Sequence, residues 1–200
     1  MSNDGQVTRT ASSTLPTPYG VFGITVYRSA SDDREHAALF LGRPEETPTM
    51  VRVHSQCVTG DTFLSLRCDC GEQLRKSMEL IAKRGSGVIL YLAQEGRGIG
   101  LSDKIRAYAL QDGGLDTVEA NEALGRPADA RDYGIAAAIL RDLGIGKILL
   151  LTNNPDKIKQ LTSHGIEIAE LRQLTVAPNA HNRAYLETKR NKFGHAIPAI

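Results

Sequence analysis

The three cysteines of this sequence, Cys57, Cys68 and Cys70, all fall within fourteen residues. An odd number of clustered cysteines argues against a disulfide framework. Thiolates are soft ligands that suit zinc, and Cys68 and Cys70 are spaced closely enough to reach one ion. A structural zinc usually takes four protein ligands, whereas a catalytic zinc takes three and keeps a position for water. The cluster therefore predicts a catalytic zinc site.

Two other interpretations of the cysteines stay open at this point. His54 could supply a fourth ligand and close the site. The cysteines could also be buried thiols of an ordinary core, which is a common role. Arg52, Arg67 and Asp69 are polar neighbours of the cysteines in the sequence, and they argue against a purely apolar core role.

Two stretches have the composition of phosphate-binding turns. Glu95-Gly96-Arg97-Gly98-Ile99-Gly100 follows an apolar run and precedes a helical pattern, and its glycines permit close approach of backbone amides to an anion. It matches neither the dinucleotide fingerprint nor the P-loop, so an ordinary turn explains it equally well. Leu151–Lys157 is a second strand-to-helix junction, where Thr152 and Lys157 could contact a phosphate or Asn154-Pro155 could simply cap a helix.

Asp129 and Arg131 lie two residues apart in a polar stretch. In an extended backbone they share a face. Such a pair is most often a surface salt bridge of small energetic value, and it indicates no chemistry by itself.

The elements that would position these residues alternate between strands and helices. We expect strands at 21–27, 36–41, 49–55, 87–92, 147–151 and 166–171, and helices at 101–110, 133–143, 155–164 and about 182–194. Helical spacing from Leu74 to Ile81, stopped by Gly85, predicts one further helix, and residues 111–131 read mostly as loop. The pattern predicts an α/β fold: a single domain with a mixed central sheet flanked by helices, and antiparallel strands in the N-terminal third.

Composition narrows the classes of function. The 200 residues carry a net charge of +1, and only 5% are aromatic, which argues against a nucleic-acid-binding protein. The longest apolar runs are too short to cross a bilayer, and no signal peptide is evident, so we expect no membrane association and a cytoplasmic location. Residues 1–17 are polar and rich in Ser and Thr, which predicts a flexible tail before a domain at 18–195 and a short tail at 196–200.

Together the motifs resemble GTP cyclohydrolase II, the enzyme that commits GTP to riboflavin synthesis. The resemblance runs in order from about residue 18 to residue 195. Its matching stretches are Arg52–Cys57, Thr59–Asp61, Ser65–Gly71, Gln94–Leu101, Lys104–Asp112, Asp116–Asn121, Ala128–Arg131 and Leu151–Pro155.

The resemblance implies a role for each matching position. The zinc ligands would be Cys57, Cys68 and Cys70, and a zinc-activated water would attack C8 of guanine to free formate. Asp129 would be the proton acceptor, Arg131 the nucleophile at the α-phosphate with pyrophosphate leaving, and Tyr108 a tyrosine beside the guanine. The residues implied to contact GTP are Arg52, Val53, His54, Ser55, Gln56, Gln73, Glu95, Gly96, Arg97, Thr117, Thr152 and Lys157. Magnesium on the triphosphate and a homodimer are also implied.

Arginine stays protonated at ordinary pH, so elementary chemistry favours Arg131 as a clamp on phosphate charge. The chain also departs from the family pattern. Gln56 stands where glutamate is usual, Ala93 stands where a basic residue is usual, and 175–179 is less basic than usual. Two alternatives follow: a divergent cyclohydrolase that stops at a formylamino-pyrimidine or serves a specialised pathway, and a non-catalytic, zinc-stabilised nucleotide-binding protein.

Overall fold

The computed structural model describes residues 7–30 and 32–198. Its contacts group the chain into two compact units, each described by itself. The sheet unit comprises Met1–His54, Arg75–Ala93 and Asp132–Leu174, and the cysteine unit comprises Ser55–Leu74, Gln94–Arg131 and Thr175–Ile200.

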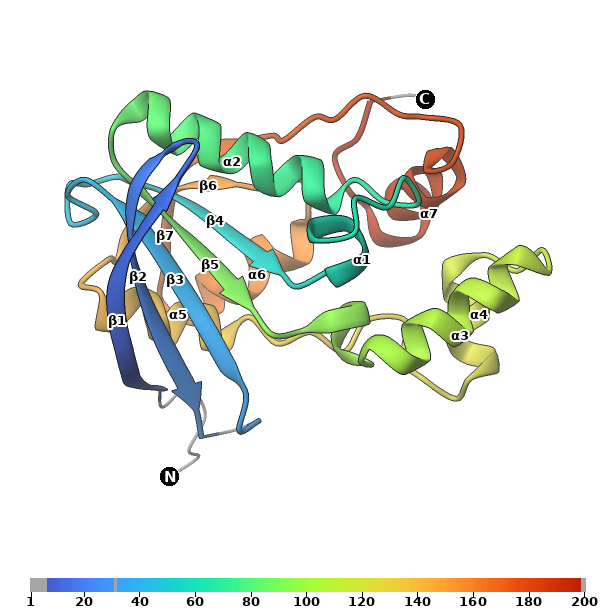
Figure 1. Ribbon diagram of the computed structural model, residues 1–200. Helices are drawn as coiled ribbons and strands as arrows, with labels where there is room; N and C mark the ends of the chain where they lie inside the picture. Colours follow the sequence, from blue (N-terminus) through green and yellow to red (C-terminus); the bar gives the residue numbers. More distant parts are fainter. Residues whose placement is uncertain (1–6, 31, 199–200) are drawn as a thin grey trace. The chain divides into compact units, whose positions relative to one another are not determined.

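The sheet unit is built on a mixed sheet of seven strands, counted over the described residues, in the order β1-β2-β3-β5-β4-β6-β7 (Figure 1). The strands are β1 (Val7–Thr17), β2 (Gly20–Ser29), β3 (Glu35–Leu41), β4 (Thr49–Ser55), β5 (Gly87–Leu92), β6 (Lys147–Leu151) and β7 (Glu167–Arg172). β1, β2, β3 and β5 pair antiparallel, while β4, β6 and β7 pair parallel. The predicted mixed sheet with antiparallel strands in the N-terminal third is confirmed.

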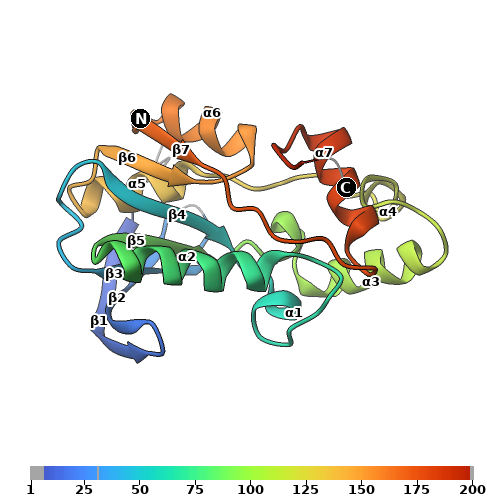
Figure 2. The same ribbon diagram turned by 90° about the horizontal axis from the view of Figure 1, so that it is seen from above.

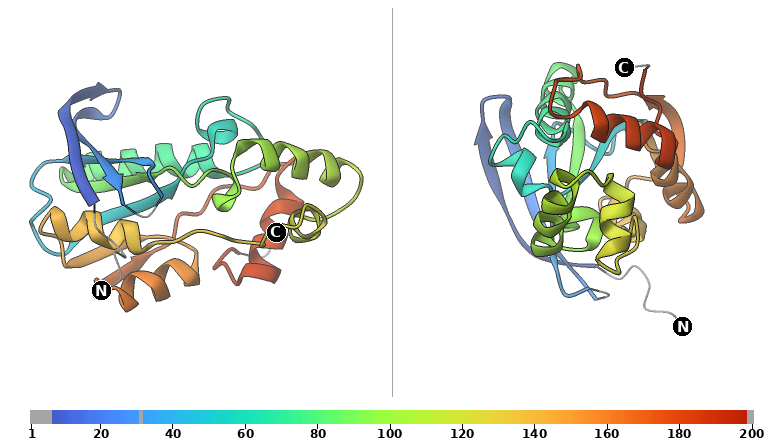
Figure 3. Two further views of the ribbon diagram at one scale, coloured as in Figure 1. Left: turned by 90° about the horizontal axis from the view of Figure 1, so that it is seen from below. Right: turned by 90° about the vertical axis from the view of Figure 1, so that its right-hand side faces the viewer.

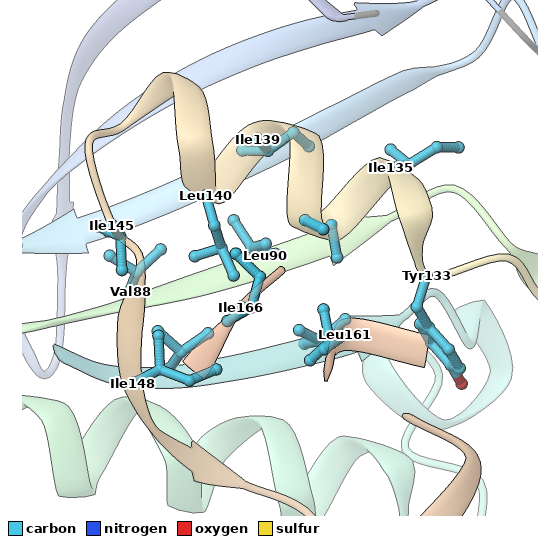
Figure 4. Close-up of a cluster of buried hydrophobic side chains, with 14 of the residues drawn as sticks. Val88, Leu90, Tyr133, Ile135, Ile139, Leu140, Ile145, Ile148, Leu161 and Ile166 are labelled. Carbon is cyan, nitrogen blue, oxygen red and sulfur yellow. The ribbon is translucent and has the colours of Figure 1, made fainter. Parts of the chain in front are cut away.

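Helices cover both faces of this sheet. Within the sheet unit, α2 (Cys70–Arg84) lies on one face, and α5 (Gly134–Asp142) and α6 (Pro155–Ser163) lie on the other (Figures 2 and 3). The core forms where β4, β5 and β6 meet α5 (Figure 4). β5 and β6 are apolar at nearly every position, β4 is buried at nearly every position, and α5 buries every residue from Gly134 to Leu140. This core fixes the ends of β4, β5 and β6, where several of the candidate residues lie.

The cysteine unit consists of short helices and loops. It contains α1 (Val58–Asp61), the first turn of α2, the short 3₁₀ helix η1 (Glu95–Gly98), α3 (Leu101–Asp112), α4 (Thr117–Ala123) and α7 (Arg183–Phe193). Within it α4 packs against both α3 and α7 (Figure 3). No described helix has the length and apolar composition needed to cross a membrane.

The prediction of a flexible tail at 1–17 is wrong for residues 7–17. They form β1, which pairs along its length with β2, and Arg9 Nε donates to Asp142 Oδ2 at 2.5 Å. Nearly every residue of β1 is exposed, so the strand lacks the apolar alternation that reveals a strand in a sequence, and backbone pairing holds it instead. Residues 1–6 lie outside the described residues.

The prediction of mostly loop at 111–131 is also wrong in part, because Thr117–Ala123 form α4. Asp116 caps this helix by accepting from the amides of Val118 and Glu119, and the Glu119 carboxylate accepts from the Asp116 amide. This reciprocal capping box was readable in the sequence as Asp116-Thr117-Val118-Glu119. At the C-terminus, residues 196–198 have no regular structure, and residues 199–200 lie outside the described part.

Candidate metal and nucleotide site

The three cysteines converge in the cysteine unit. Their sulfur atoms all lie within 4.8 Å of one another, and Cys57 Sγ is 3.6 Å from Cys68 Sγ. Tetrahedral zinc with Zn–S bonds of about 2.3 Å places its sulfurs about 3.8 Å apart, so the donors fit one ion. Among the described residues no other group of three or more His, Cys, Asp or Glu side chains is so arranged. His54 is not part of the group, and its ring stacks on Tyr91 with centroids 5.6 Å apart.

Local structure brings the cysteines together around Gly60. Cys57 precedes α1 and donates its amide to Asp61 Oδ2 at 2.9 Å, while Cys70 opens α2. A Cβ atom at Gly60 would lie 2.7 Å from Cys68 Sγ and 3.3 Å from Cys57 Sγ. No side chain fits at this position, so the glycine lets α1 approach the sulfurs.

A buried lysine, Lys104, lies against the cysteine cluster. Lys104 Nζ is 3.1 Å from Cys57 Sγ and 2.7 Å from Glu95 Oε1, and Glu95 Oε2 accepts from the Val58 amide at 2.6 Å. Burial alone would lower the pKa of Lys104, but the charge of Cys57 and the bond to Glu95 outweigh it and the pKa is raised. Hydrogen bonds from the other two thiols lower the pKa of Cys57, and the Lys104 ammonium adds to this effect. The Lys104 ammonium therefore balances negative charge on the cysteine cluster.

Tyr108 lies beside the same group. Its hydroxyl is 3.4 Å from Thr59 Oγ1, which is in turn 3.5 Å from Cys57 Sγ. The Arg67 guanidinium lies 5.0 Å from the centre of the Tyr108 ring. Burial raises the pKa of Tyr108, so the phenol is protonated and can donate a hydrogen bond.

The glycine-rich loop folds as η1 and lies against the segment that carries Asp129 and Arg131. The Ala130 amide donates to Arg97 O at 3.0 Å. Gly98 has φ +92°, and a Cβ there would lie 3.0 Å from Ala130 O, so the close approach of the two segments requires a glycine. Arg97 is thus a neighbour of Asp129 and Arg131, although more than thirty residues separate it from them in the sequence.

Asp129 and Arg131 form a paired contact. Arg131 Nε donates to Asp129 Oδ1 at 2.9 Å, and the terminal Nη2 donates to Oδ2 at 2.5 Å. Burial alone would raise the pKa of Asp129, but the hydrogen bonds and charge of Arg131, with the charge of Arg97, lower it. The carboxylate is therefore ionised at neutral pH and fixes the plane of the guanidinium.

The remaining candidates of the cysteine unit are Gln73, Ser55, Thr117 and Gln56. Gln73 is buried and donates to Asp69 Oδ2 at 2.6 Å, and Ser55 Oγ donates to Gln94 Oε1 at 3.3 Å. Thr117 is the first residue of α4, and Gln56 is half-buried between Ser55 and Cys57.

A second group of candidates belongs to the sheet unit, at the ends of β4 and β6. Arg52 Nη1 donates to Leu151 O at 3.0 Å, and Lys157 Nζ donates to Val53 O at 2.7 Å. Thr152 Oγ1 accepts from the Asn154 amide at 3.1 Å. Asn154 also caps α6 by accepting from the Asp156 amide at 3.0 Å, so the interpretation of Asn154-Pro155 as a helix cap is confirmed.

Comparison with known proteins shows which family the chain resembles. The family model described as GTP cyclohydrolase II matches residues 8–173. The chain is 53% identical over 188 residues to GTP cyclohydrolase-2 of Pseudomonas syringae pv. tomato, covering 94% of this chain and 92% of that protein. The chain belongs to the GTP cyclohydrolase II family. The GTP cyclohydrolase-2 of Azotobacter vinelandii is 52% identical over 191 residues, with 95% and 92% covered.

The family also occurs as part of longer proteins. The riboflavin biosynthesis protein RibBA of Chlorobium phaeovibrioides is 56% identical over 192 residues, which is 96% of this chain and 47% of RibBA. The chain thus spans about half the length of the first curated relatives it matches. The crystal structure of RibBX, a two domain 3,4-dihydroxy-2-butanone 4-phosphate synthase from A. baumannii, is 26% identical with a TM-score of 0.52, covering 86% of this chain and 40% of RibBX.

Ala93, which departs from the usual GTP cyclohydrolase II pattern, has a charged side chain bound to its backbone in the sheet unit. The Ala93 amide donates to His36 Nδ1 at 3.1 Å, and the Arg34 guanidinium donates to Ala93 O at 3.0 Å. A cation therefore stands at the backbone of residue 93 although the side chain there is a methyl group.

Proposed function

We propose that this chain opens the imidazole ring of GTP by hydrolysis and releases formate and pyrophosphate. The product would be 2,5-diamino-6-(5-phospho-ribosylamino)pyrimidin-4-one, which makes this the first step of riboflavin synthesis. The observation that carries the proposal is the convergence of three cysteine sulfurs within 4.8 Å in a member of this family.

The metal would be zinc, held by Cys57, Cys68 and Cys70. Bound there, it would supply the Lewis acidity that makes a water nucleophilic toward C8 of guanine at neutral pH. The chain's own groups prepare this position. Gly60 keeps space for the sulfurs, and the Lys104 ammonium at 3.1 Å offsets the negative charge of the thiolates. The phenol of Tyr108 can donate a hydrogen bond to a ring that is being opened.

Both groups of polar residues would contact GTP. In the cysteine unit these are Ser55, Gln56, Gln73, Glu95, Gly96, Arg97 and Thr117, and in the sheet unit they are Arg52, Val53, His54, Thr152 and Lys157. Magnesium would accompany the triphosphate. We also propose a homodimer, for which light scattering on the purified protein would give twice the mass of one chain.

At the α-phosphate, Arg131 would stabilise charge while pyrophosphate leaves. Its guanidinium is held in plane by Asp129 through bonds of 2.9 and 2.5 Å, which supports a positioned cation. A guanidinium paired to a carboxylate is a poor nucleophile, since the pairing favours its protonated form. Asp129 would orient Arg131 and, as an ionised carboxylate, could accept a proton from water.

The test is GTP turnover with magnesium, with formate and pyrophosphate assayed separately and the product identified by mass spectrometry. We expect both products from the wild type. Cys68→Ser should abolish metal content and formate release, and Arg131→Ala should slow pyrophosphate release at least 100-fold. The matched control is Arg183→Ala, an exposed arginine at the start of α7, which should behave as wild type.

The same assay decides between the alternatives. Pyrophosphate without formate would indicate either GMP or the formylamino-pyrimidine of a divergent cyclohydrolase, and mass spectrometry of the product would separate the two. Zinc-loaded protein that binds GTP but releases neither product would contradict the proposal and leave a nucleotide-binding role.

A further inference from the structure

Helix α7 (Arg183–Phe193) lies beyond residues 8–173, which the family model matches, and the proposed function assigns it no part. Yet its Lys189 reaches the metal-binding turn. Lys189 Nζ donates to Asp69 Oδ1 at 2.8 Å and to Oδ2 at 3.2 Å. The Lys189 side chain is 9% exposed and that of Asp69 is 3% exposed, so this is a buried ion pair.

Asp69 is the residue between the two ligands Cys68 and Cys70. Its carboxylate also accepts from Gln73 Nε2 at 2.6 Å, and its carbonyl accepts the Gln73 amide at 2.9 Å in the first turn of α2. The main chain of Asp69 is joined directly to both flanking cysteines, so a shift of that main chain moves them. Lys189 and Gln73 both bind the carboxylate of the residue that joins two of the three ligands.

We propose that Lys189 is a positioning residue for the metal centre: it fixes the Cys68-Asp69-Cys70 turn through the Asp69 carboxylate. This inference rests on the proposed function only in that it takes the cysteines to bind zinc. Outer groups that orient metal ligands typically change metal affinity 10–100-fold when removed. A buried carboxylate beside three thiolates also needs a compensating cation, which Lys189 supplies.

Other contacts hold α7 within the cysteine unit independently of Lys189. The Arg97 guanidinium lies 4.0 Å from the centre of the Phe193 ring, and Lys192 pairs with Asp116, the cap of α4. A Lys189→Met variant therefore keeps the helix in place and removes one charge. Lys192→Met is the matched control, because it removes an ion pair from the same helix without touching the cysteine turn.

The experiment measures zinc affinity by competition with a chromophoric chelator for the wild type, Lys189→Met, Lys192→Met, Asp69→Asn and the double variant Asp69→Asn/Lys189→Met. We expect Lys189→Met to weaken zinc binding at least tenfold and Lys192→Met to stay within twofold of wild type. In the Asp69→Asn background, Lys189→Met should have less than a twofold further effect, because the charge that it neutralises is gone. Cobalt-substituted Lys189→Met should show altered thiolate-to-cobalt absorption, a signature that general destabilisation does not produce.

Zinc affinity of Lys189→Met within twofold of wild type would overturn the inference, as would an equal loss in Lys192→Met. If Lys189→Met fails to fold, the result depends on Asp69→Asn and the double variant: equal affinity supports the inference, and a further tenfold loss in the double variant contradicts it. Wild-type protein that binds zinc and releases formate while Lys189→Met is unaffected would remove this inference alone. Wild-type protein that binds no zinc would remove the proposed metal site and this inference with it.

Discussion

At the level of single residues, the geometry of the cysteine cluster depends on the space left at Gly60 as well as on the three cysteines. A Cβ atom does not fit at Gly60, because it would lie 2.7 Å from Cys68 Sγ. We expect Gly60→Ala to displace the sulfurs and weaken zinc binding at least tenfold. Gly146→Ala is the control, since a Cβ there meets nothing within 4 Å. Zinc competition on both variants checks this, and equal affinities would show that the cluster can relax.

The ion pair of Asp129 and Arg131 gives a prediction for stability against pH. The pKa of Asp129 is lowered on folding, so the ionised pair stabilises the fold above the unfolded value of about 3.9 and loses this effect as pH falls through the lowered folded-state pKa. We expect Asp129→Asn to cost about 1–2 kcal/mol of unfolding free energy at pH 7, since the pair is partly buried.

Urea unfolding of wild type and Asp129→Asn at pH 7 and pH 3 measures this difference, which should shrink at pH 3. Asp33→Asn, at a side chain that is 90% exposed, should show no difference at either pH. A gap between wild type and Asp129→Asn that is as large at pH 3 as at pH 7 would rule out the ionised pair as its cause.

Residue types predicted the metal ligands, but not the residues that support them. The three cysteines were found because cysteine is rare in this chain and thiolates bind metals. Lys104 and Lys189 carry no local signal of their role, because nothing in the neighbouring sequence shows that they reach Cys57 and Asp69 across 47 and 120 residues. Contacts at such separations arise from the tertiary fold, which local patterns do not encode.

At the scale of elements, β1 is the main departure from the sequence prediction and carries a test. Residues 7–17 pair with β2 at the edge of the sheet, and Arg9 and the Tyr27 hydroxyl share Asp142 Oδ2 at 2.5 and 2.8 Å. We expect deletion of residues 1–17 to lower the melting temperature by roughly 5–10 °C, which corresponds to a loss of about 2–4 kcal/mol in a chain of this size. An unchanged melting temperature would restore the interpretation as a tail.

Elements with a buried face were predictable, and elements without one were not. The apolar runs of β5 and β6 and the helical spacing of α2 predicted these elements, because burial in the core demands apolar side chains. β1 is exposed along almost its whole length, and α4 has only seven residues and two buried positions, Ala120 and Asn121. For these two elements, pairing and capping decide the structure, and hydrophobic periodicity gives no signal.

At the scale of the whole molecule, the two units differ in what stabilises them. The sheet unit has a continuous apolar core, whereas the cysteine unit depends on short helices, buried ion pairs and the proposed metal. We expect chelation of zinc to speed amide exchange in α1 and the first turn of α2, while β5 and β6 keep their protection. Hydrogen exchange with mass spectrometry measures both regions in one sample. Equal acceleration in both units would mean that the metal stabilises the whole molecule.

Ring opening at C8 can be followed directly by NMR, with GTP labelled with ¹³C at C8 in the presence of zinc-loaded protein and magnesium. We expect the label to leave the guanine and appear as ¹³C-formate, and prior removal of zinc by a chelator to stop its appearance. A label that stays on the nucleotide while zinc-loaded protein is present would contradict the proposed opening of the ring.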